Sequence, residues 1–246
     1  MNRVGNSGKL VCAWLVAVSL IALLPASAFA AGTLPSNEVG SDISWPQCSG
    51  DMPQDPYTFG IIGVTGGHPF SGNPCLAHEV TWARETGRVN LYINLDYGLR
   101  ENGPLACLAE DTGCQAYNYG YQGAQWAYQY ANQATEGVSV GVSTWWLDVE
   151  TENYWSEDSV QNAYVIQGAL DFMQRKLNKT TGVYSTSYQW NEIAGGFAPP
   201  GTPNWVAGAG GLDDYGKCGA SIWPGADVWA IQYLNFDLDL DQNYSC

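Results

Sequence analysis

Short apolar runs and helical patterns alternate along most of the chain. Runs rich in β-branched and aromatic residues predict strands, over 40–45, 59–65, 89–95, 142–150 and 182–187. Between them, apolar residues at spacings of three and four predict helices, over 74–86, over 118–134 and from an N-cap at Ser156 to near Lys179. A short helical piece follows the fifth strand, up to Gly195. Such alternation is typical of parallel β-α units.

The pattern changes beyond Pro199 and Pro200, where helical periodicity stops. Three further strands are predicted, over 204–209, 227–233 and 236–241, joined by loops rich in Gly and Pro. The sequence therefore predicts an α/β fold, a single irregular TIM-like (β/α) barrel with about five β-α units followed by three strands lacking helices. The first and last strands meet in such a closed barrel.

The N-terminal segment has the pattern of a secretory signal peptide. Arg3 and Lys9 precede an apolar run over 10–24, and Ala28 and Ala30 supply the small residues of a cleavage site. The run is shorter than the roughly 20 apolar residues that span a bilayer, and no later stretch comes closer. We expect residues 1–30 to be a signal peptide, residues 31–246 to be one domain, and the protein to be secreted without a membrane span.

The charge balance argues against nucleic acid as a partner. The chain has 9 basic and 24 acidic residues, a formal net charge of −15. Removal of Arg3 and Lys9 with the signal peptide leaves 7 − 24 = −17. Such a surface repels phosphates, and no basic stripe reverses this locally. Aromatic residues make up 13% of the chain, so its composition is that of a folded protein.

The cysteine count favours disulfide bonds. Cys12 lies in the signal peptide, and six cysteines remain: Cys48, Cys75, Cys107, Cys114, Cys218 and Cys246. An even number in an exported chain indicates three disulfides, although six cysteines allow 15 pairings. We favour pairing in sequence order, with the short Cys107–Cys114 loop as the clearest pair. The alternative, a thiolate or metal site, usually has a CxxC spacing that is absent here.

Acidic residues at one strand end are the candidates for chemistry. Along the strand over 142–150, Trp146, Asp148 and Glu150 share one face, and barrels of this kind place their active sites at the C-terminal strand ends. Carboxylates two residues apart lie roughly 6 to 7 Å apart between Cα atoms and push each other's pKa apart. Asp42 in the first strand can reach the same rim. The alternative is that these acids are solvated loop residues.

Several segments occur in an order that resembles glycoside hydrolase family 25, the family of secreted lysozymes that cut peptidoglycan between its amino sugars. They are Gly40-Ser41-Asp42-Ile43-Ser44 with Gln47, Phe59-Gly60-Ile61-Ile62, Leu147-Asp148-Val149-Glu150, Gly182-Val183-Tyr184-Ser185, Asn204-Trp205-Val206-Ala207 and Ile231-Gln232-Tyr233. The resemblance covers nearly the whole chain after the signal peptide, and it implies the same barrel.

The resemblance also implies roles for individual residues. It makes Glu150 the general acid and Asp148 its partner, which steadies the N-acetyl group of the substrate, and it matches Asp42 to an aspartate of the first-strand motif. It places a further acid near the C-terminus, where Asp237, Asp239 and Asp241 are alternatives. The substrate-binding residues that it implies are Tyr92, Asn94, Trp146, Tyr184, Trp205, Gln232, Asp239 and Asp241.

Two functions remain open at this point. The first is a secreted glycoside hydrolase of lysozyme type, a monomer with no cofactor or metal, acting on a cell-wall polysaccharide such as peptidoglycan. The second is a catalytically inactive barrel that binds such a glycan. Gly63 stands where the family commonly has a basic residue, and Tyr92-Ile93-Asn94 stands where a Tyr-His pair is common. These departures are why the second hypothesis is kept.

Other site types are weaker candidates. His68 and His78 are too few for a three-histidine zinc site, and the acids at 237–241 lack the glycine of a calcium loop. Tryptophans near strand ends are candidates for stacking on sugar rings, although at least half should pack in the core. They are Trp45, Trp145, Trp146, Trp155, Trp190, Trp205 and Trp229.

Overall fold

Eight strands pair in chain order and close into a barrel. The structure, a computed structural model, describes residues 1, 34, 36–54, 57–137, 141–211, 214–235 and 240–246. The strands are β1 (Val39–Ile43), β2 (Phe59–Gly63), β3 (Val89–Asn94), β4 (Trp145–Asp148), β5 (Thr181–Ser185), β6 (Asn204–Ala209), β7 (Val228–Asn235) and β8 (Leu240–Ser245). Neighbours from β1 to β7 are parallel, and β8 closes the barrel antiparallel to β7 and β1. The predicted fold class is confirmed.

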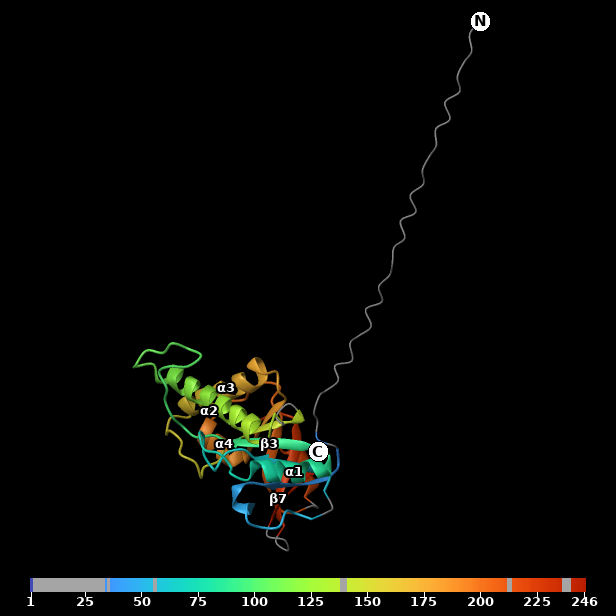
Figure 1. The fold of residues 1–246 in the computed structure, drawn as a ribbon. Helices are drawn as coiled ribbons and strands as arrows, with labels where there is room; N and C mark the ends of the chain where they lie inside the picture. The colour runs from blue at the N-terminus through green and yellow to red at the C-terminus, as the bar shows by residue number, and fades with distance from the viewer. Residues whose placement is uncertain (2–33, 35, 55–56, 138–140, 212–213, 236–239) are drawn as a thin grey trace. The chain divides into compact units, whose positions relative to one another are not determined.

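Four α-helices follow β2, β3, β4 and β5 in turn. They are α1 (Leu76–Thr86), α2 (Thr112–Ala134), α3 (Ser159–Leu170) and α4 (Ser187–Ala194), and a π-helical turn, η3 (Asp171–Lys176), continues α3. Helices α2 and α3 pack against each other (Figure 1). Gly120 and Gly168 permit this approach, because a Cβ on either would collide with the backbone of the partner helix. A short 3-10 turn, η4 (Tyr215–Gly219), precedes β7.

The expected fifth helix, after β1, is absent among the described residues. A single 3-10 turn, η1 (Trp45–Gln47), takes its place, with Pro46 in its first turn. The Ser44 N–H donates to Oε1 of Gln47 at 2.9 Å, which closes the turn at once. Cys48, its C-cap, is then held in a disulfide. The short turn therefore ends before a helix can propagate.

Two helix starts differ from the sequence prediction. Helix α3 is capped by Asp158, whose carboxylate accepts from the N–H of Val160 at 2.9 Å, and not by Ser156. Helix α2 begins six residues before the predicted Asn118, at Thr112, because Asp111 accepts from the N–H of Cys114 at 3.0 Å. In both helices the first residue is set by an aspartate whose side chain caps the helix, which moves the start of α2 earlier and that of α3 later than predicted.

Buried side chains form two layers. Residues that point into the barrel form the smaller one, including Phe59, Ile61, Trp146, Tyr184 and Trp205. The larger one lies between the strands and the helices. Strands β2, β4 and β5 are buried along their whole length, as their near-continuous apolar runs predict.

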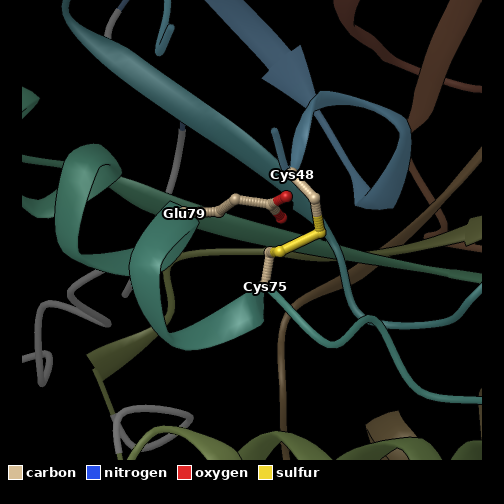
Figure 2. A group of neighbouring side chains, drawn as sticks. All are labelled: Cys48, Cys75 and Glu79. Atoms are coloured by element: carbon tan, nitrogen blue, oxygen red, sulfur yellow. A yellow bond between two sulfur atoms is a disulfide. The ribbon is translucent and has the colours of Figure 1, made fainter. Parts of the chain in front are cut away.

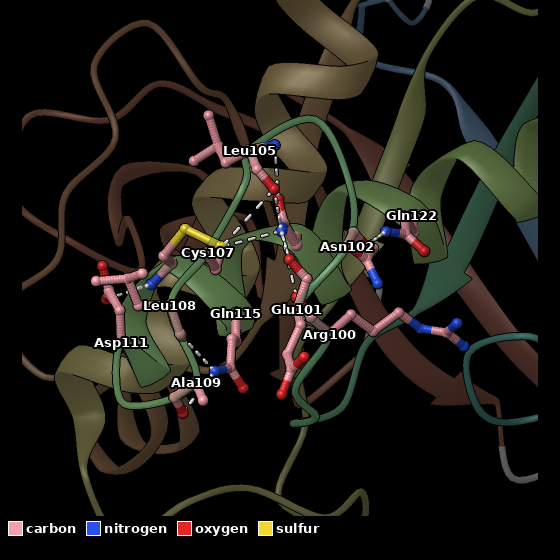
Figure 3. The surroundings of a disulfide bond; sticks show 12 residues. Arg100, Glu101, Asn102, Leu105, Cys107, Leu108, Ala109, Asp111, Gln115 and Gln122 are labelled. Atoms are coloured by element: carbon pink, nitrogen blue, oxygen red, sulfur yellow. Dashed lines mark hydrogen bonds between the residues drawn. A yellow bond between two sulfur atoms is a disulfide. The ribbon is translucent and has the colours of Figure 1, made fainter.

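All three disulfides join cysteines in sequence order: Cys48–Cys75, Cys107–Cys114 and Cys218–Cys246. Figure 3 shows the second pair, which fastens the loop between β3 and α2 to the first turn of α2. Asn118, from α2, donates to the carbonyl of Leu105 in that loop at 2.8 Å. The predicted pairing is confirmed.

Residues 31–246 form one compact unit. The signal peptide predicted over 1–30 lies outside the described residues except for Met1, so it stays a prediction. Among the helices that the structure describes, none has the length and apolar character needed to cross a membrane.

Candidate active site

Three predicted acids meet at the C-terminal rim of the parallel strands. Asp42 lies on β1, Asp148 ends β4, and Glu150 follows two residues later. Strand alternation turns them to the inner face, whereas Trp145, Leu147 and Val149 face the helices. The charges of the three groups act on one another's pKa values. The structure thus brings together residues that are about a hundred positions apart in the sequence.

Asp148 is the most buried of the three, with 4% of its surface exposed. The amide of Asn94 donates to its Oδ2. Thr65 fixes this amide, because its hydroxyl donates to Oδ1 of Asn94 at 2.6 Å. The other oxygen, Oδ1, is buried and has no donor among the described residues. Burial, and then the neighbouring Glu150 charge, raise the pKa of Asp148 well above its ordinary value.

Glu150 lies beside Asp148 and is only half-buried. Burial raises the pKa of Glu150, and the charge of Glu152 raises it further. Hydrogen bonds with Asp148 and Gln189 act in the opposite direction. Two buried carboxyl groups in contact cannot both ionise readily, so the pair retains a proton above the usual carboxyl range. Glu150 is the member of the pair that is open to a ligand.

Amide side chains hold Asp42 from the opposite side of the barrel. Nε2 of Gln232 donates to Oδ1 and Oδ2 of Asp42 at 3.1 and 3.2 Å, and Nδ2 of Asn243 donates to Oδ2 at 2.6 Å. Tyr184 donates to Oε1 of Gln232 at 2.6 Å, and Trp205 donates to Oδ1 of Asn243 at 2.7 Å. These two donors fix both amides with their N–H groups toward Asp42. Burial, and then the charge of Asp241, raise the pKa of Asp42 to about 7.

Tyr92 occupies the space next to Gly63, which is one of the departures from the family pattern. Its ring and hydroxyl lie against Gly63, where a Cβ would collide with Tyr92 and with Ser44. Burial is the main cause that raises the pKa of Tyr92, and its hydroxyl is hydrogen-bonded to the Ser44 side chain. The phenol is therefore neutral. In this protein a tyrosine and a serine fill the place next to Gly63.

The predicted substrate contacts of Trp146 and Trp205 are contradicted by their burial. Trp146 is fully covered and Trp205 is 2% exposed. Their ring centroids lie 5.8 Å apart, and that of Tyr184 lies 4.3 Å from Trp205. Both indoles belong to the barrel core beneath the acids, since a wide aromatic ring fills the interior of a small barrel.

At least half of the seven candidate tryptophans pack in the core, as expected. Trp145, Trp146, Trp190 and Trp205 are buried, and Trp155 and Trp229 are half-buried. Trp45 is 48% exposed at the end of β1. Of the predicted stacking residues, Trp45 thus presents the most surface at the rim.

Asp241 is the C-terminal acid that the structure relates to the site. It is exposed near the start of β8, and its charge raises the pKa of Asp42 and of Glu150. Asp237 and Asp239 lie outside the described residues. The sequence prediction placed the last strand over 236–241, whereas β8 continues to Ser245.

Sequence reasoning missed four contributors to the site, namely Ser44, Thr65, Gln189 and Asn243. The alternation that links Asp241 to Asn243 was a usable signal for one of them. Ser44 and Thr65 follow strand ends, and Gln189 lies in the first turn of α4. At these positions residue type alone does not show where the side chain points. Among the described residues, the three rim acids do not offer a set of metal ligands close enough for one ion.

Comparison with known proteins supports a lysozyme-like barrel. A family model described as lysozyme-like protein 1 matches residues 113–207. A curated relative, probable GH family 25 lysozyme 5 of Dictyostelium discoideum, is 31% identical over 104 residues, which are 40% of this chain and 48% of the relative. The chain thus spans about half the length of this curated relative.

Solved structures match over more of the chain. A family GH25 lysozyme from Aspergillus fumigatus has a TM-score of 0.56 at 15% identity, covering 86% of this chain and 94% of that one. The spore cortex lytic enzyme of Clostridium perfringens has a TM-score of 0.58 at 14% identity, covering 87% and 68%. The chain is therefore similar in fold to a glycoside hydrolase family 25 lysozyme over most of its length, and similar in sequence to lysozyme-like proteins over a shorter part, as its ordered motifs predict.

Proposed function

We propose that the protein is a glycoside hydrolase of lysozyme type that cleaves peptidoglycan or a related amino-sugar polysaccharide. The observation that carries this proposal is the contact between the buried Asp148 and the half-buried Glu150 at the rim, with the pKa of both raised. Lysozymes and muramidases are also what the chain is similar to.

Glu150 is the general acid in this proposal. Cleavage of a glycosidic bond requires a proton on the leaving oxygen, and an acid that keeps its proton near neutral pH supplies it. The Asp148–Glu150 pair retains such a proton. Glu150 delivers it, because Glu150 is the more exposed member of the pair. Loss of the proton leaves negative charge on the pair, which stabilises the positive charge that develops on the sugar.

Asp148 and Asp42 act beside the leaving group. Asp148 steadies the N-acetyl group of the substrate, as the resemblance implies, and its amide partner Asn94 holds it in place. Asp42 lies across the barrel mouth, held by Gln232 and Asn243. Its pKa of about 7 lets it accept a hydrogen bond from a sugar when ionised and donate one when protonated.

We also propose that the protein is secreted as a monomer without a metal, following cleavage after Ala30. The charge and apolar pattern of residues 1–30 supports export, and three disulfides are typical of an oxidising compartment. Intact mass measurement of the protein from the culture medium should give an N-terminus at Ala31. A mass that retains residues 1–30 would contradict the export proposal.

A catalytically inactive, glycan-binding barrel is the second candidate. The departure from the family's Tyr-His pair over 92–94 favours it, because the side chain that contacts Asp148 there is the amide of Asn94, which supplies no proton for acid catalysis. This candidate keeps the rim acids as hydrogen-bonding groups for sugar hydroxyls and predicts no turnover.

Digestion of purified peptidoglycan, with soluble products identified by mass spectrometry, separates the two candidates. Hydrolysis between amino sugars by wild type, and its loss in Glu150→Gln, would support the enzyme. Glu192→Gln is the matched control, since Glu192 is exposed on α4. Retained glycan binding with no products from wild type would overturn the enzyme and favour the binding barrel.

A further inference from the structure

A second group of functional side chains lies between the end of η1 and the start of α1. Cys48 is the C-cap of η1, Cys75 is the N-cap of α1, and Glu79 lies one turn into α1. Figure 2 shows the Glu79 carboxylate directed toward the Cys48–Cys75 disulfide. One ligand atom from each residue lies within 4.8 Å of the others. This is the one such group found among the described residues, and the proposed catalytic site does not use it.

Glu79 is an acid without adequate partners. It is fully buried, and its Oε2 accepts from Nδ2 of Asn73 at 2.6 Å. Its Oε1 has no hydrogen-bond donor in the described part of the chain. The amide of Asn73 is already engaged, because Nδ2 also donates to the Gly63 carbonyl at 2.8 Å and Oδ1 accepts from the Cys75 N–H at 2.9 Å. Burial of a carboxylate whose oxygen has no hydrogen-bond donor costs folding free energy, unless a cation or a further donor contacts it.

We infer that reduction of the Cys48–Cys75 disulfide creates a zinc site formed by the two thiolates and the Glu79 carboxylate. Two equivalents of a thiol reductant give two cysteine thiols and one reductant disulfide. Zinc then displaces the thiol protons, which pass to solvent. A site with two sulfur ligands and one oxygen ligand suits Zn²⁺, at about 2.3 Å to sulfur and about 2.0–2.2 Å to oxygen. Water fills the fourth position.

The surroundings of the group fit this assignment. Ligand atoms within 4.8 Å of one another need only side-chain rotation to reach one ion. Cys48 and Cys75 are half-buried, so reductant and metal have access from solvent, whereas Glu79 approaches from the interior. Zinc brings the positive charge that the carboxylate lacks. In the disulfide form the sulfurs are not thiolates, and no metal binds.

The consequence is a link between the β1–β2 segment and α1 in both redox states. The disulfide makes the link under oxidising conditions, and zinc makes it under reducing conditions. Because η1 follows β1 directly and Ser44 is hydrogen-bonded to Tyr92, the link also holds one side of the rim. This inference is independent of the proposed catalytic activity.

Metal titration of the reduced protein tests the site. The chain over residues 31–246 is reduced with a phosphine, freed of reductant under anaerobic conditions and titrated with ZnCl₂ against a chromophoric chelator. Reduced wild type should bind one more zinc equivalent than reduced Cys48→Ser/Cys75→Ser. Co²⁺ in place of zinc should give thiolate-to-metal absorption that the double variant lacks. Oxidised wild type should bind neither metal at this site.

Two further variants locate the ligands. Glu79→Gln keeps both thiols and should weaken zinc binding about tenfold or more, since even outer-shell partners of a metal contribute about that much. Cys107→Ser/Cys114→Ser removes a different pair and should leave the zinc equivalent in place. Circular dichroism of each reduced protein checks that it remains folded, and wild type should gain thermal stability on addition of zinc.

Three results would overturn the inference. One is equal zinc uptake by reduced wild type and Cys48→Ser/Cys75→Ser. Another is loss of the zinc equivalent on removal of Cys107 and Cys114 instead. The third is unchanged affinity in Glu79→Gln, which would leave a two-thiol site without the carboxylate. If the reduced wild type unfolds and zinc does not restore its structure, the proposed link under reducing conditions is also wrong.

Discussion

The helix-covered and helix-free parts of the barrel contribute differently to the rim. Strands β2, β4 and β5 carry helices and are buried on both faces. In the described part of the chain, no α-helix directly follows β1, β7 or β8. Buried and less buried positions are mixed along these three strands. Asp148 and Glu150 come from the covered part, whereas Asp42 comes from the helix-free part.

The two parts also differ in the hydrogen-bond donors that they offer to their acids. Asp42 receives hydrogen bonds from Gln232 and Asn243, each fixed by a further donor. Asp148 accepts a hydrogen bond from the amide of Asn94, and its Oδ1 has no hydrogen-bond donor among the described residues. Burial, and then the charge of Glu150, raise the pKa of Asp148 well above its ordinary value. Burial and the charge of Asp241 raise the pKa of Asp42 to about 7, and its two amide donors oppose that rise. Amide donors to a buried acid therefore favour its ionised form, whereas a charged acidic neighbour favours its protonated form.

Of the substitutions proposed here, Glu150→Gln should have the largest effect on activity. It removes the proposed general acid from the covered part, so turnover of peptidoglycan should fall by about 10²-fold to 10⁴-fold. Glycan binding should change little, because the amide keeps the shape and hydrogen-bonding capacity of the side chain. Rates of product release and binding to insoluble glycan give the two values. Wild-type rates in this variant would reject the assignment.

Removal of single disulfides should lower the free energy of unfolding by different amounts in the two parts. Cys218–Cys246 joins η4 to the end of β8 with a sequence separation of 28, and Cys107–Cys114 spans 7. Chain entropy predicts a loss of roughly 3.6 kcal/mol when the first is replaced by serines and roughly 2.4 kcal/mol for the second. Denaturant unfolding measures both. The order would be reversed if strain or residual structure in the unfolded chain dominated. Peptide mapping without reductant should detect no free thiol over 31–246.

Asp148→Asn should lower turnover by about tenfold to 10²-fold, because the substrate loses a positioning group. It also leaves Glu150 to titrate without its coupled partner. The pKa of the acid should then fall, and the falling alkaline limb of the pH–rate profile should move to lower pH. An unchanged limb would show that the two carboxyls do not share a proton. Far-UV circular dichroism controls for folding, since Asp148 is buried.

Asp42→Asn should give a smaller effect on activity and a measurable change in the pH dependence of stability. Burial raises the pKa of Asp42 in the folded protein from 3.8 to about 7. Its contribution to stability is therefore complete below pH 3.8 and is lost as pH rises through about 7. The thermal midpoint of wild type should fall as pH rises from about 4 to about 8. The variant should show a shallower fall, and exposed Asp227→Asn should match wild type.

That pH series also tests the barrel and the site together. Asp148 contributes in the same direction as Asp42 and remains in the variant, so the slope should be reduced and not abolished. Activity or glycan affinity should drop while the midpoint at pH 5 changes little. A variant that unfolds at pH 5 would make Asp42 a structural acid.

The sequence by itself predicted the barrel class, the strand order and the candidate acids at the rim, and it favoured one disulfide pairing among fifteen. These features depend on local periodicity, on spacing and on residue type, which are all visible along the chain. Strand alternation was enough to place Trp146, Asp148 and Glu150 on one face. It was not enough to show that Trp146 packs against Trp205 and Trp229, because burial depends on strands that are distant in the sequence.

Only the tertiary structure decided the chemical state of each acid. Asn94 and Thr65 meet Asp148 from β3 and from the loop after β2, and Gln232 and Asn243 meet Asp42 from β7 and β8. The pKa of a carboxyl group depends on the water it loses and the donors and charges it gains. Those neighbours are set by barrel closure, and closure brings them from three strands and one loop that no local pattern relates to one another.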